Sequence, residues 1–270
     1  MSNYKYLVLS DLDGTLLNSE GLVSEGTKKF VHEINKRDDI LFCFSTGRCW
    51  RDCKRIYEEL ELKGFVSCCN GAFIYNPREE LVRYSFISEK LWTFFLQNSY
   101  FTEGLLKGDV LTDKGNFSLT EDNGQEVLSR LRDCKANVYG IKTYFNYRKP
   151  TPELELKFVK RINDLKQLDC PPSLTIFHYP DILNLEIHAN YVNKERAVEF
   201  LGNYYGIAPN NILTFGDQVN DLSVAMGTSR FCAVGNALDS IKQVSNRISE
   251  YSNDEDGVVK ELQVFLNKEI

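Results

Sequence analysis

Short apolar runs alternate with segments of helical periodicity in the first third of the chain. Apolar runs at residues 6–9, 40–44 and 65–69 have the length of buried strands. Helical patterns fill the two intervals, at about residues 24–36, which open on a serine N-cap, and 50–60. This order predicts a parallel, doubly wound sheet, and ligands bind such sheets beyond the carboxyl ends of their strands.

The middle of the chain, at about residues 74–184, follows a different pattern. It is rich in Phe and Tyr, carries the turn-like segments Asn76-Pro77 and Cys170-Pro171-Pro172, and alternates in patches such as residues 139–147. Strand-like and helical stretches are mixed there, and no group of catalytic residue types stands out. We predict a separate α+β domain inserted into the first one.

From residue 185 the alternation of strands and helices returns. The expected elements are a helix at 195–205, a strand at 211–215, a short helix at 221–226, a strand at 231–234 and a closing helix at 256–266. We therefore predict an α/β fold with a doubly wound, parallel-sheet (Rossmann-like) core. The core is expected at residues 1–76 and 186–270, and an α+β cap domain at 77–185.

Composition and charge narrow the class of protein. The chain has 270 residues, 43% of them hydrophobic and 26% charged, as in ordinary globular proteins. A net charge of −6 argues against coating a nucleic acid, which needs a basic surface. No apolar run reaches the roughly 18 residues of a membrane span, and the N-terminus does not resemble a signal peptide. The eight cysteines form no CxxC pair, so we expect reduced thiols and a cytoplasmic protein without membrane or nucleic-acid partners.

The first candidate site is Asp11-Leu12-Asp13-Gly14-Thr15-Leu16, directly after the first apolar run. Two carboxylates two residues apart can face one site. One can act as a nucleophile and the other can protonate a leaving group and then activate water. Gly14 allows a sharp turn that leaves backbone amides, such as that of Leu12, for phosphate oxygens. The alternative is a plain turn, in which Asp-Gly pairs are common.

The second candidate site is Gly216-Asp217-Gln218-Val219-Asn220-Asp221, again after a strand. Magnesium prefers a few carboxylates and keeps several waters. Asp217 at the strand end suits a direct ligand, while Asn220 and Asp221 can bind metal-held water or orient the loop. The alternative is an Asx turn that caps the next helix.

Single residues between these motifs add candidates. The Thr46 hydroxyl and the Gly47 amide can hold phosphate at a helix N-terminus, although Thr46 also suits a plain N-cap. Lys194 opens a helix, where the helix dipole disfavours a cation, so a nearby phosphate and carboxylates would explain it. A surface lysine is the alternative.

Three further residues are candidates for facing the substrate. Asn70 and Gly71 follow the third strand, next to the expected start of the inserted domain. Arg48 follows the Thr-Gly pair and can contact phosphate or pair with an acid elsewhere.

The ordered set DLDGTL, STGR, a helix-opening lysine and GDQVND resembles the haloacid dehalogenase-like superfamily. The segments CNGAFIY, VGNA and EDGVV are similar to its Cof-type sugar-phosphatase branch. The resemblance covers roughly residues 5–75 and 183–265. It implies that Asp11 is the nucleophile that forms an aspartyl-phosphate and that Asp13 is the general acid and base.

The resemblance also implies a cofactor and its ligands. Thr46 and Lys194 would contact phosphate, and Mg²⁺ would be the cofactor. Ser10, Gln218, Val219 and His188 depart from the usual residues of the family, but none of them replaces a catalytic group. The implied Mg²⁺ ligands are Asp11, the carbonyl of Asp13, and Asp217, with Asn220 and Asp221 in support.

Spacing places the inserted domain. Asp13 and Thr46 are 33 residues apart (46 − 13), which is too few for a loop, a helix, a strand and an extra domain. Asn70 and Lys194 are 124 residues apart (194 − 70), which leaves room for one. The resemblance implies that this larger α/β cap closes over the site and selects the substrate.

The sequence thus predicts a magnesium-dependent phosphatase acting on a small phosphorylated metabolite, with sugar phosphates as the family-level expectation. A phosphomutase of the same superfamily and a non-catalytic sensor of a phosphorylated metabolite are the alternatives. The physiological substrate, the cap residues that select it and the oligomeric state stay open.

Overall fold

The structure, a computed structural model, describes residues 4–148 and 152–269. The chain divides into two compact units, a core unit of Met1–Tyr84 with Asn193–Ile270 and an inserted unit of Ser85–Val192. Both divisions fall later than the expected boundaries after residues 76 and 185. On one side one further strand, β5 (Leu81–Tyr84), extends the core sheet, and on the other a strand of the inserted unit runs on to His188.

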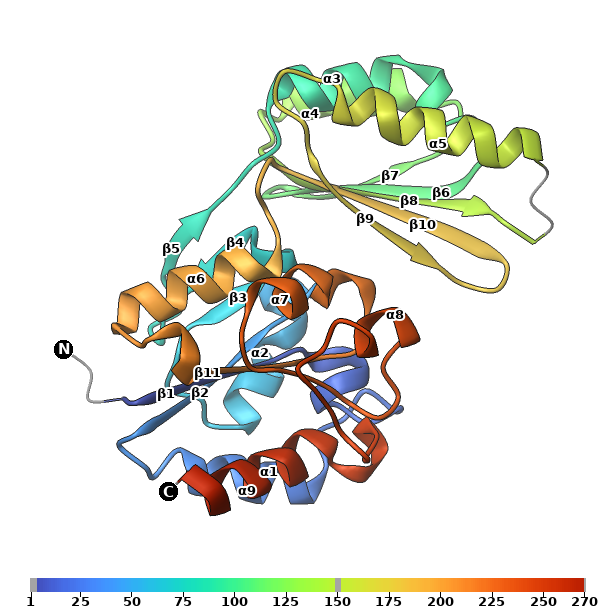
Figure 1. The fold of residues 1–270 in the computed structure, drawn as a ribbon. Coiled ribbons are helices and arrows are strands. Elements are labelled where there is room, and N and C mark those ends of the chain that lie inside the picture. The colour runs from blue at the N-terminus through green and yellow to red at the C-terminus, as the bar shows by residue number, and fades with distance from the viewer. Residues whose placement is uncertain (1–3, 149–151, 270) are drawn as a thin grey trace. The chain divides into compact units, whose positions relative to one another are not determined.

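The core unit is built on an eight-stranded sheet (Figure 1). Its order is β13-β12-β11-β1-β2-β3-β4-β5, and the strands from β13 to β3 pair in parallel. β4 and β5 add antiparallel at one edge. The bounds are β1 Tyr6–Ser10, β2 Ile40–Ser45, β3 Val66–Cys68, β4 Phe73–Tyr75, β5 Leu81–Tyr84, β11 Ile212–Gly216, β12 Phe231–Ala233 and β13 Arg247–Ile248.

Helices flank both faces of this sheet, which confirms the predicted doubly wound core. In Figure 1, α1 and α9 lie side by side on one face, and α6 and α7 lie together on the other. The Ser24 hydroxyl caps α1 by accepting from the Thr27 amide at 2.9 Å, and α6 ends at Gly206 with a left-handed φ of 68°. The helices are α1 Glu25–Ile34, α2 Trp50–Glu59, α6 Lys194–Tyr205, α7 Leu222–Gly227, α8 Asp239–Lys242 and α9 Gly257–Glu269.

The inserted unit is an antiparallel sheet covered by helices, as the α+β prediction requires. Its strand order is β7-β6-β8-β10-β9. Alternate side chains of β8 and β10, such as Ile141, Leu185 and Ile187, join the helices α3 and α4 in one apolar core. The elements are α3 Glu89–Gln97, β6 Leu105–Thr112, β7 Gly115–Leu119, α4 Gly124–Asp133, β8 Val138–Asn146, α5 Pro152–Lys166, β9 Ser173–His178 and β10 Ile182–His188.

The other face of this sheet carries a buried ionic cluster. Glu186 accepts from the Lys142 ammonium at 2.8 Å, and its second oxygen lies 3.6 Å from Nε2 of His188. Burial raises the pKa of Glu186, but the nearby imidazole of His188 and the ammonium of Lys142 outweigh it and bring the pKa down to about 2. One carboxylate is therefore matched by two basic groups.

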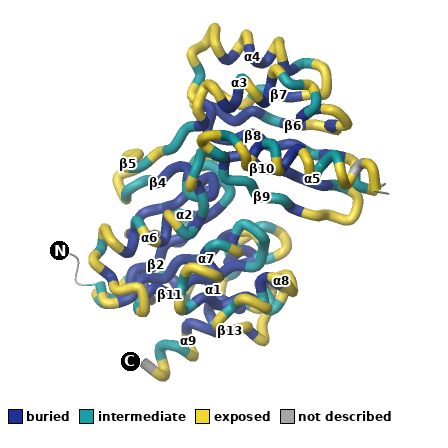
Figure 2. The backbone as a smooth tube through the Cα atoms, turned by 45° about the horizontal axis from the view of Figure 1, so that its top comes forward, coloured by how far each residue is buried: buried dark blue, intermediate teal, exposed yellow. Residues whose placement is uncertain are grey.

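Burial follows the layers of each unit. Figure 2 shows the central strands of the core sheet, such as β2 and β11, buried along their length, while the outer sides of the helices are exposed. Within residues 4–148 and 152–269, no helix combines the length and the apolar character needed to cross a membrane.

Candidate active site

The carboxyl ends of four strands bring the candidate residues to one edge of the core sheet. In the sheet register Ser10 pairs with Phe44 on one side and with Phe215 on the other. Asp11, which follows Ser10, therefore emerges between Ser45 and Gly216. The Asp11 amide donates to the Phe215 carbonyl at 3.0 Å, which extends the pairing by one residue.

A buried lysine lies between two of these carboxylates. The Lys194 ammonium contacts Oδ2 of Asp11 at 2.9 Å and Oδ1 of Asp221 at 2.7 Å. The three side chains are at most 6% exposed. Lys194 is the first residue of α6, as the sequence suggested, and its place between carboxylates explains a cation at a helix N-terminus.

The surroundings of Asp11 and Lys194 raise the pKa of both side chains. Burial raises the pKa of Asp11 to about 8; Lys194 opposes this shift, and Asp221 and Asp217 add to it. Burial lowers the pKa of Lys194, but Asp11 and Asp221 outweigh it and hold the pKa above its usual range. Burial thus dominates the shift of Asp11, and the two contacting carboxylates dominate the shift of Lys194.

Asp217 follows β11, the strand next to β1, and lies at the same edge of the sheet as Asp11. Its Oδ1 accepts from the Thr15 hydroxyl at 2.6 Å. Burial, opposed by the Thr15 bond and reinforced by the charge of Asp221, raises the pKa of Asp217 to about 6. A Cβ on Gly14 would stand 2.5 Å from Oδ2 of Asp217. Glycine is therefore required there for the loop to approach this carboxylate, as well as for its left-handed φ of 72°.

Asp13 and Arg48 form a two-bond ion pair beside this cluster. The Arg48 guanidinium donates through Nε to Oδ2 of Asp13 at 2.8 Å and through Nη2 to Oδ1 at 2.5 Å. The Asp13 side chain is 57% exposed, so it lies at the solvent side of the site. Of the two roles left open for Arg48, the structure has the pairing with an acid.

The loops after β2 and β3 are tied to each other. The Asn70 amide donates to the Thr46 carbonyl at 2.9 Å, and the Thr46 hydroxyl accepts from the Arg48 amide at 3.1 Å. Asn70 has a left-handed φ of 56°, and a Cβ on Gly71 would stand 2.5 Å from the Asn193 carbonyl. Gly71 thus lets this loop pack against the start of α6.

Asn220 joins the two halves of the site. Its Nδ2 donates to Oδ1 of Asn70 at 3.1 Å. Its own Oδ1 is buried and has no hydrogen-bond partner in the described part of the chain. A buried acceptor of this kind calls for a donor such as water.

Three carboxylates are close enough to share a cation. One oxygen from each of Asp11, Asp217 and Asp221 lies within 4.8 Å of the others. Asp221 is already engaged, because its Oδ2 accepts from the amides of Asp217 and Gln218 and its Oδ1 from Lys194. Carboxylate oxygens in this number fit a hard cation that keeps some of its waters.

Comparisons with known proteins agree with this geometry. The model of the haloacid dehalogenase-like hydrolase family matches residues 8–262. The chain belongs to this family. It is therefore a hydrolase by descent, and the resemblance found in the sequence is confirmed.

Individual relatives match along almost the whole chain. A 5-amino-6-(5-phospho-D-ribitylamino)uracil phosphatase of Bacillus subtilis, YitU, is 26% identical, with 99% of this chain and 100% of the relative covered. A haloacid dehalogenase-like hydrolase structure from B. subtilis aligns with a TM-score of 0.76 at 22% identity, over 96% of this chain and 99% of that one. A subclass IIB sugar phosphatase aligns with a TM-score of 0.73 at 16% identity, over 96% and 98%. These two structures show the shared fold.

Two residues that support the family's first motif escaped the sequence analysis. Asn236 donates to the Gly14 carbonyl at 2.8 Å and accepts from the Asn253 amide at 2.8 Å. Asn253 in turn donates to the Leu17 carbonyl at 2.9 Å. They lie in and just before the VGNA and EDGVV segments, so the resemblance marked their neighbourhood without giving their role.

Proposed function

We propose that this hydrolase is a magnesium-dependent phosphatase that cleaves small phosphate monoesters through an aspartyl-phosphate on Asp11. The observation that carries the proposal is the buried contact of Lys194 with Asp11 and Asp221 at the carboxyl edge of the sheet. It fixes a carboxylate in orientation and adds positive charge where a phosphate would gain negative charge. Fixed charge of this kind is commonly the largest contribution to catalysis of such reactions.

The nucleophile is one oxygen of Asp11. Lys194 engages Oδ2, so we assign the attack to Oδ1. Oδ1 forms a bond to phosphorus as the bond from phosphorus to the ester oxygen breaks. Asp13 donates a proton to that departing oxygen and an alcohol leaves.

The second half returns the enzyme to its starting state. Asp13, now a carboxylate, takes a proton from a water molecule as the water oxygen attacks phosphorus. The bond between phosphorus and Oδ1 breaks, inorganic phosphate forms and Asp11 is a carboxylate again. Asp13 ends protonated, so atoms and charge balance over the cycle.

Arg48 has a place in this scheme as the holder of Asp13. Both oxygens of Asp13 accept from Arg48, and the carboxyl group must turn one of them toward the ester oxygen to donate its proton. One of the two bonds therefore opens before proton transfer. The remaining bond keeps the carboxyl group aimed at the site.

Phosphate contacts come from groups with donors to offer. The Thr46 hydroxyl accepts from Arg48, which leaves its own proton to donate to a phosphate oxygen. The amides of Leu12 and Gly47 and the ammonium of Lys194 complete the set in this proposal.

We assign Mg²⁺ to Asp11, Asp217 and the carbonyl of Asp13, with Asn220 and Asp221 in support. When bound, the ion offsets the repulsion between carboxylates and phosphate and stabilises charge on the phosphate oxygens. Burial and the neighbouring carboxylates raise the pKa values of Asp11 and Asp217, and a bound cation would offset this unfavourable negative charge.

We assign the choice of substrate to the inserted unit, which corresponds to the expected cap. The named functions of relatives, a ribityl phosphate phosphatase and a sugar phosphatase, support a small polyhydroxylated phosphate ester as substrate class.

The test is release of inorganic phosphate from p-nitrophenyl phosphate and from a panel of phosphorylated sugars and ribityl compounds. We expect turnover with Mg²⁺ and none after chelation. Asp11→Asn should abolish turnover of every compound while thermal unfolding shows a folded protein. Turnover that persists in Asp11→Asn would refute the proposal, and so would a folded wild-type protein that cleaves nothing in the panel.

A further inference from the structure

A short segment connects the two loops that carry the assigned cation ligands. Residues 234–238, which we name the strap, follow β12 directly. The Asn236 side chain donates to the Gly14 carbonyl at 2.8 Å, and the Leu238 amide donates to the Asp217 carbonyl at 3.0 Å. The strap therefore bonds both to the loop after β1 and to the loop after β11.

These two loops also contact each other. The Thr15 hydroxyl donates to Oδ1 of Asp217 at 2.6 Å, and a Cβ on Gly14 would stand 2.5 Å from Oδ2 of Asp217. Asp13, whose carbonyl is an assigned ligand, directly precedes Gly14. Each of these two ligands thus belongs to a residue that the strap holds or to its neighbour, so the strap restrains their separation.

The strap is held from a second side by the segment before α9. Oδ1 of Asn236 accepts from the Asn253 amide at 2.8 Å, and the Gly235 amide donates to the Tyr251 carbonyl at 2.8 Å. A flipped side-chain amide would set its oxygen against the Gly14 carbonyl and lose both bonds of Asn236. The orientation of Asn236 is therefore fixed.

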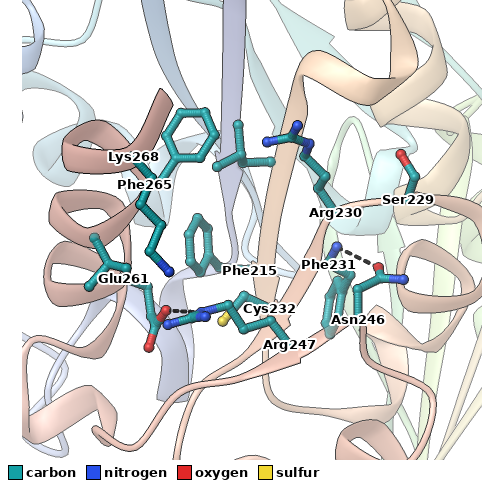
Figure 3. A pocket seen from close by; sticks show the side chains of 12 residues that line it. Phe215, Ser229, Arg230, Phe231, Cys232, Asn246, Arg247, Glu261, Phe265 and Lys268 are labelled. Carbon is teal, nitrogen blue, oxygen red and sulfur yellow. Dashed lines mark hydrogen bonds and ion pairs between the residues drawn. The ribbon is translucent and has the colours of Figure 1, made fainter. Parts of the chain in front are cut away.

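The strand before the strap is anchored at its other end, beside a hollow of about 250 Å³ (Figure 3). Phe231 begins β12, and its amide donates to Oδ1 of Asn246 at 2.8 Å. Arg247 of β13 pairs with Glu261 of α9. These contacts tie β12 to the segment before β13, and β13 to α9, so the strap leaves a strand that is itself held in place.

We propose that the strap sets the cation selectivity of the site, favouring Mg²⁺ over Ca²⁺, with Asn236 as its central positioning residue. The inference rests on the proposed function, which assigns Mg²⁺ to Asp217 and the carbonyl of Asp13. Mg²⁺ requires near-octahedral ligands at about 2.0–2.1 Å, whereas Ca²⁺ accepts about six to eight ligands at about 2.3–2.6 Å in flexible arrangements. Loops held at a fixed separation meet the demand of the smaller ion, and loops free to move apart suit the larger one.

A purely structural role of the strap predicts a different outcome. If the strap only stabilised the fold, its loss would change the affinity for both cations by a similar factor. If it restrains the spacing of the ligands, its loss weakens binding of Mg²⁺ more than binding of Ca²⁺. The ratio of the two dissociation constants separates these roles, and it can be measured without substrate.

Thermal unfolding of the full-length protein with increasing MgCl₂ or CaCl₂, at constant ionic strength and without substrate, gives both dissociation constants. The selectivity is the Kd for Ca²⁺ divided by the Kd for Mg²⁺. We expect Asn236→Ala to lower the selectivity at least about fivefold, an effect that one hydrogen bond can exert. The Mg²⁺ concentration that gives half-maximal phosphate release should rise by a similar factor.

The matched control is Asn123→Ala in the inserted unit. The Asn123 side chain donates to the Ser118 carbonyl at 3.0 Å and accepts from the Thr120 amide at 2.8 Å. This variant therefore loses two hydrogen bonds of the same kinds as Asn236→Ala, and its selectivity should equal that of wild type. Urea unfolding of both variants in a chelator establishes that each is folded.

A second variant breaks the strap at its other bond. Leu238→Pro removes the amide that donates to the Asp217 carbonyl, and the φ of −58° at Leu238 already suits proline. The Leu238 side chain is 41% exposed, so little packing is lost. Selectivity should again fall at least about fivefold, with Asn236 still in place. If Asn236→Ala does not fold, Leu238→Pro decides the question.

Three results would overturn the role of the strap. They are wild-type selectivity in Asn236→Ala, an equal fall of selectivity in Asn123→Ala, and a wild-type protein that neither cation stabilises. The phosphatase proposal is judged separately, by turnover and by Asp11→Asn. Wild-type protein that releases phosphate with Mg²⁺, while its selectivity is unchanged in folded Asn236→Ala, would refute the role of the strap alone.

Discussion

The two units each bury a cluster of charges, and the clusters are balanced in opposite ways. In the core unit, Asp11, Asp217 and Asp221 surround a single cation, Lys194, and the pKa of Asp11 is raised to about 8. In the inserted unit, Glu186 has Lys142 and His188 beside it, and its pKa falls to about 2. In the second cluster, the carboxylate therefore has its basic partners within the cluster.

This difference separates a site from a structural element. A buried carboxylate with enough cations around it stabilises the fold at neutral pH. An excess of buried carboxylates destabilises the fold unless a cation binds among them or one of them is protonated. Functional sites commonly carry such a cost in stability. The proposed reaction explains why the excess of carboxylates lies at the carboxyl edge of the core sheet.

Removing the cation of the core cluster should have the largest effect. Lys194→Met leaves buried carboxylates without their partner, and breaking buried pairs costs roughly 3–5 kcal/mol. We expect a drop of that order in the free energy of unfolding, measured by urea denaturation in a chelator, and at least a roughly thousandfold loss of phosphate release. Added Mg²⁺ should restore part of the stability.

The matched change in the other cluster is Lys142→Met. Its aryl phosphatase activity should exceed that of Lys194→Met by at least about a hundredfold. Equal losses of activity in the two variants would contradict the claim that only the core cluster is a functional site.

Glu186→Gln should have the next largest effect, on stability and its pH dependence. The folded pKa of about 2 lies below the usual 4.5, so the carboxylate stabilises the fold above about pH 4.5. That stabilisation is lost as the pH falls toward 2. We expect Glu186→Gln to lower the free energy of unfolding by about 2–3 kcal/mol at pH 7, and the gap to wild type to shrink below pH 4.5. A gap that is constant from pH 7 to pH 3 would contradict the pairing.

Asp217→Asn should change stability in the opposite direction. Burial and the charge of Asp221 raise the pKa of Asp217 to about 6, so removing its charge relieves repulsion. In the presence of a chelator we expect thermal unfolding to shift upward by an amount equivalent to about 1 kcal/mol, while phosphate release falls roughly a hundredfold or more. A less stable Asp217→Asn protein would show that the core cluster is balanced after all.

Arg48→Ala should have the smallest effect on stability, within about 0.5 kcal/mol, because the pair with Asp13 is partly exposed. Its effect on rate should depend on the leaving group. Departure of an alcohol needs the proton of Asp13, whereas departure of p-nitrophenolate needs it far less. We expect kcat for a sugar phosphate to fall at least about tenfold more than kcat for p-nitrophenyl phosphate, with partial rescue in Arg48→Lys. Equal increases in KM for both substrates would make Arg48 a phosphate contact instead.

Much of the site could be predicted because its residues follow strands. The apolar runs fixed where β1, β2 and β11 end, and parallel strands bring those ends together. Asp11, Thr46 and Asp217 could therefore be grouped from the sequence. Lys194 was recognisable as a cation in an unfavourable place at a helix start.

Other features had no comparable signal. β5 is largely exposed, so no apolar run marked it, and the core sheet was expected to stop before it. Arg48 could contact phosphate or pair with an acid, and only the geometry shows that it pairs with Asp13. Asn236 and Asn253 act through backbone contacts with a distant loop, which no local pattern encodes.

The central claim is that Asp11 carries the phosphoryl group during turnover. Acid quench of the Mg²⁺-loaded enzyme with substrate, borohydride reduction and peptide mass spectrometry test it directly, because reduction converts an aspartyl-phosphate to homoserine. We predict homoserine at position 11 in wild-type protein and none in Asp11→Asn or without substrate. Steady turnover with unmodified Asp11, or with homoserine at another position, would contradict the account.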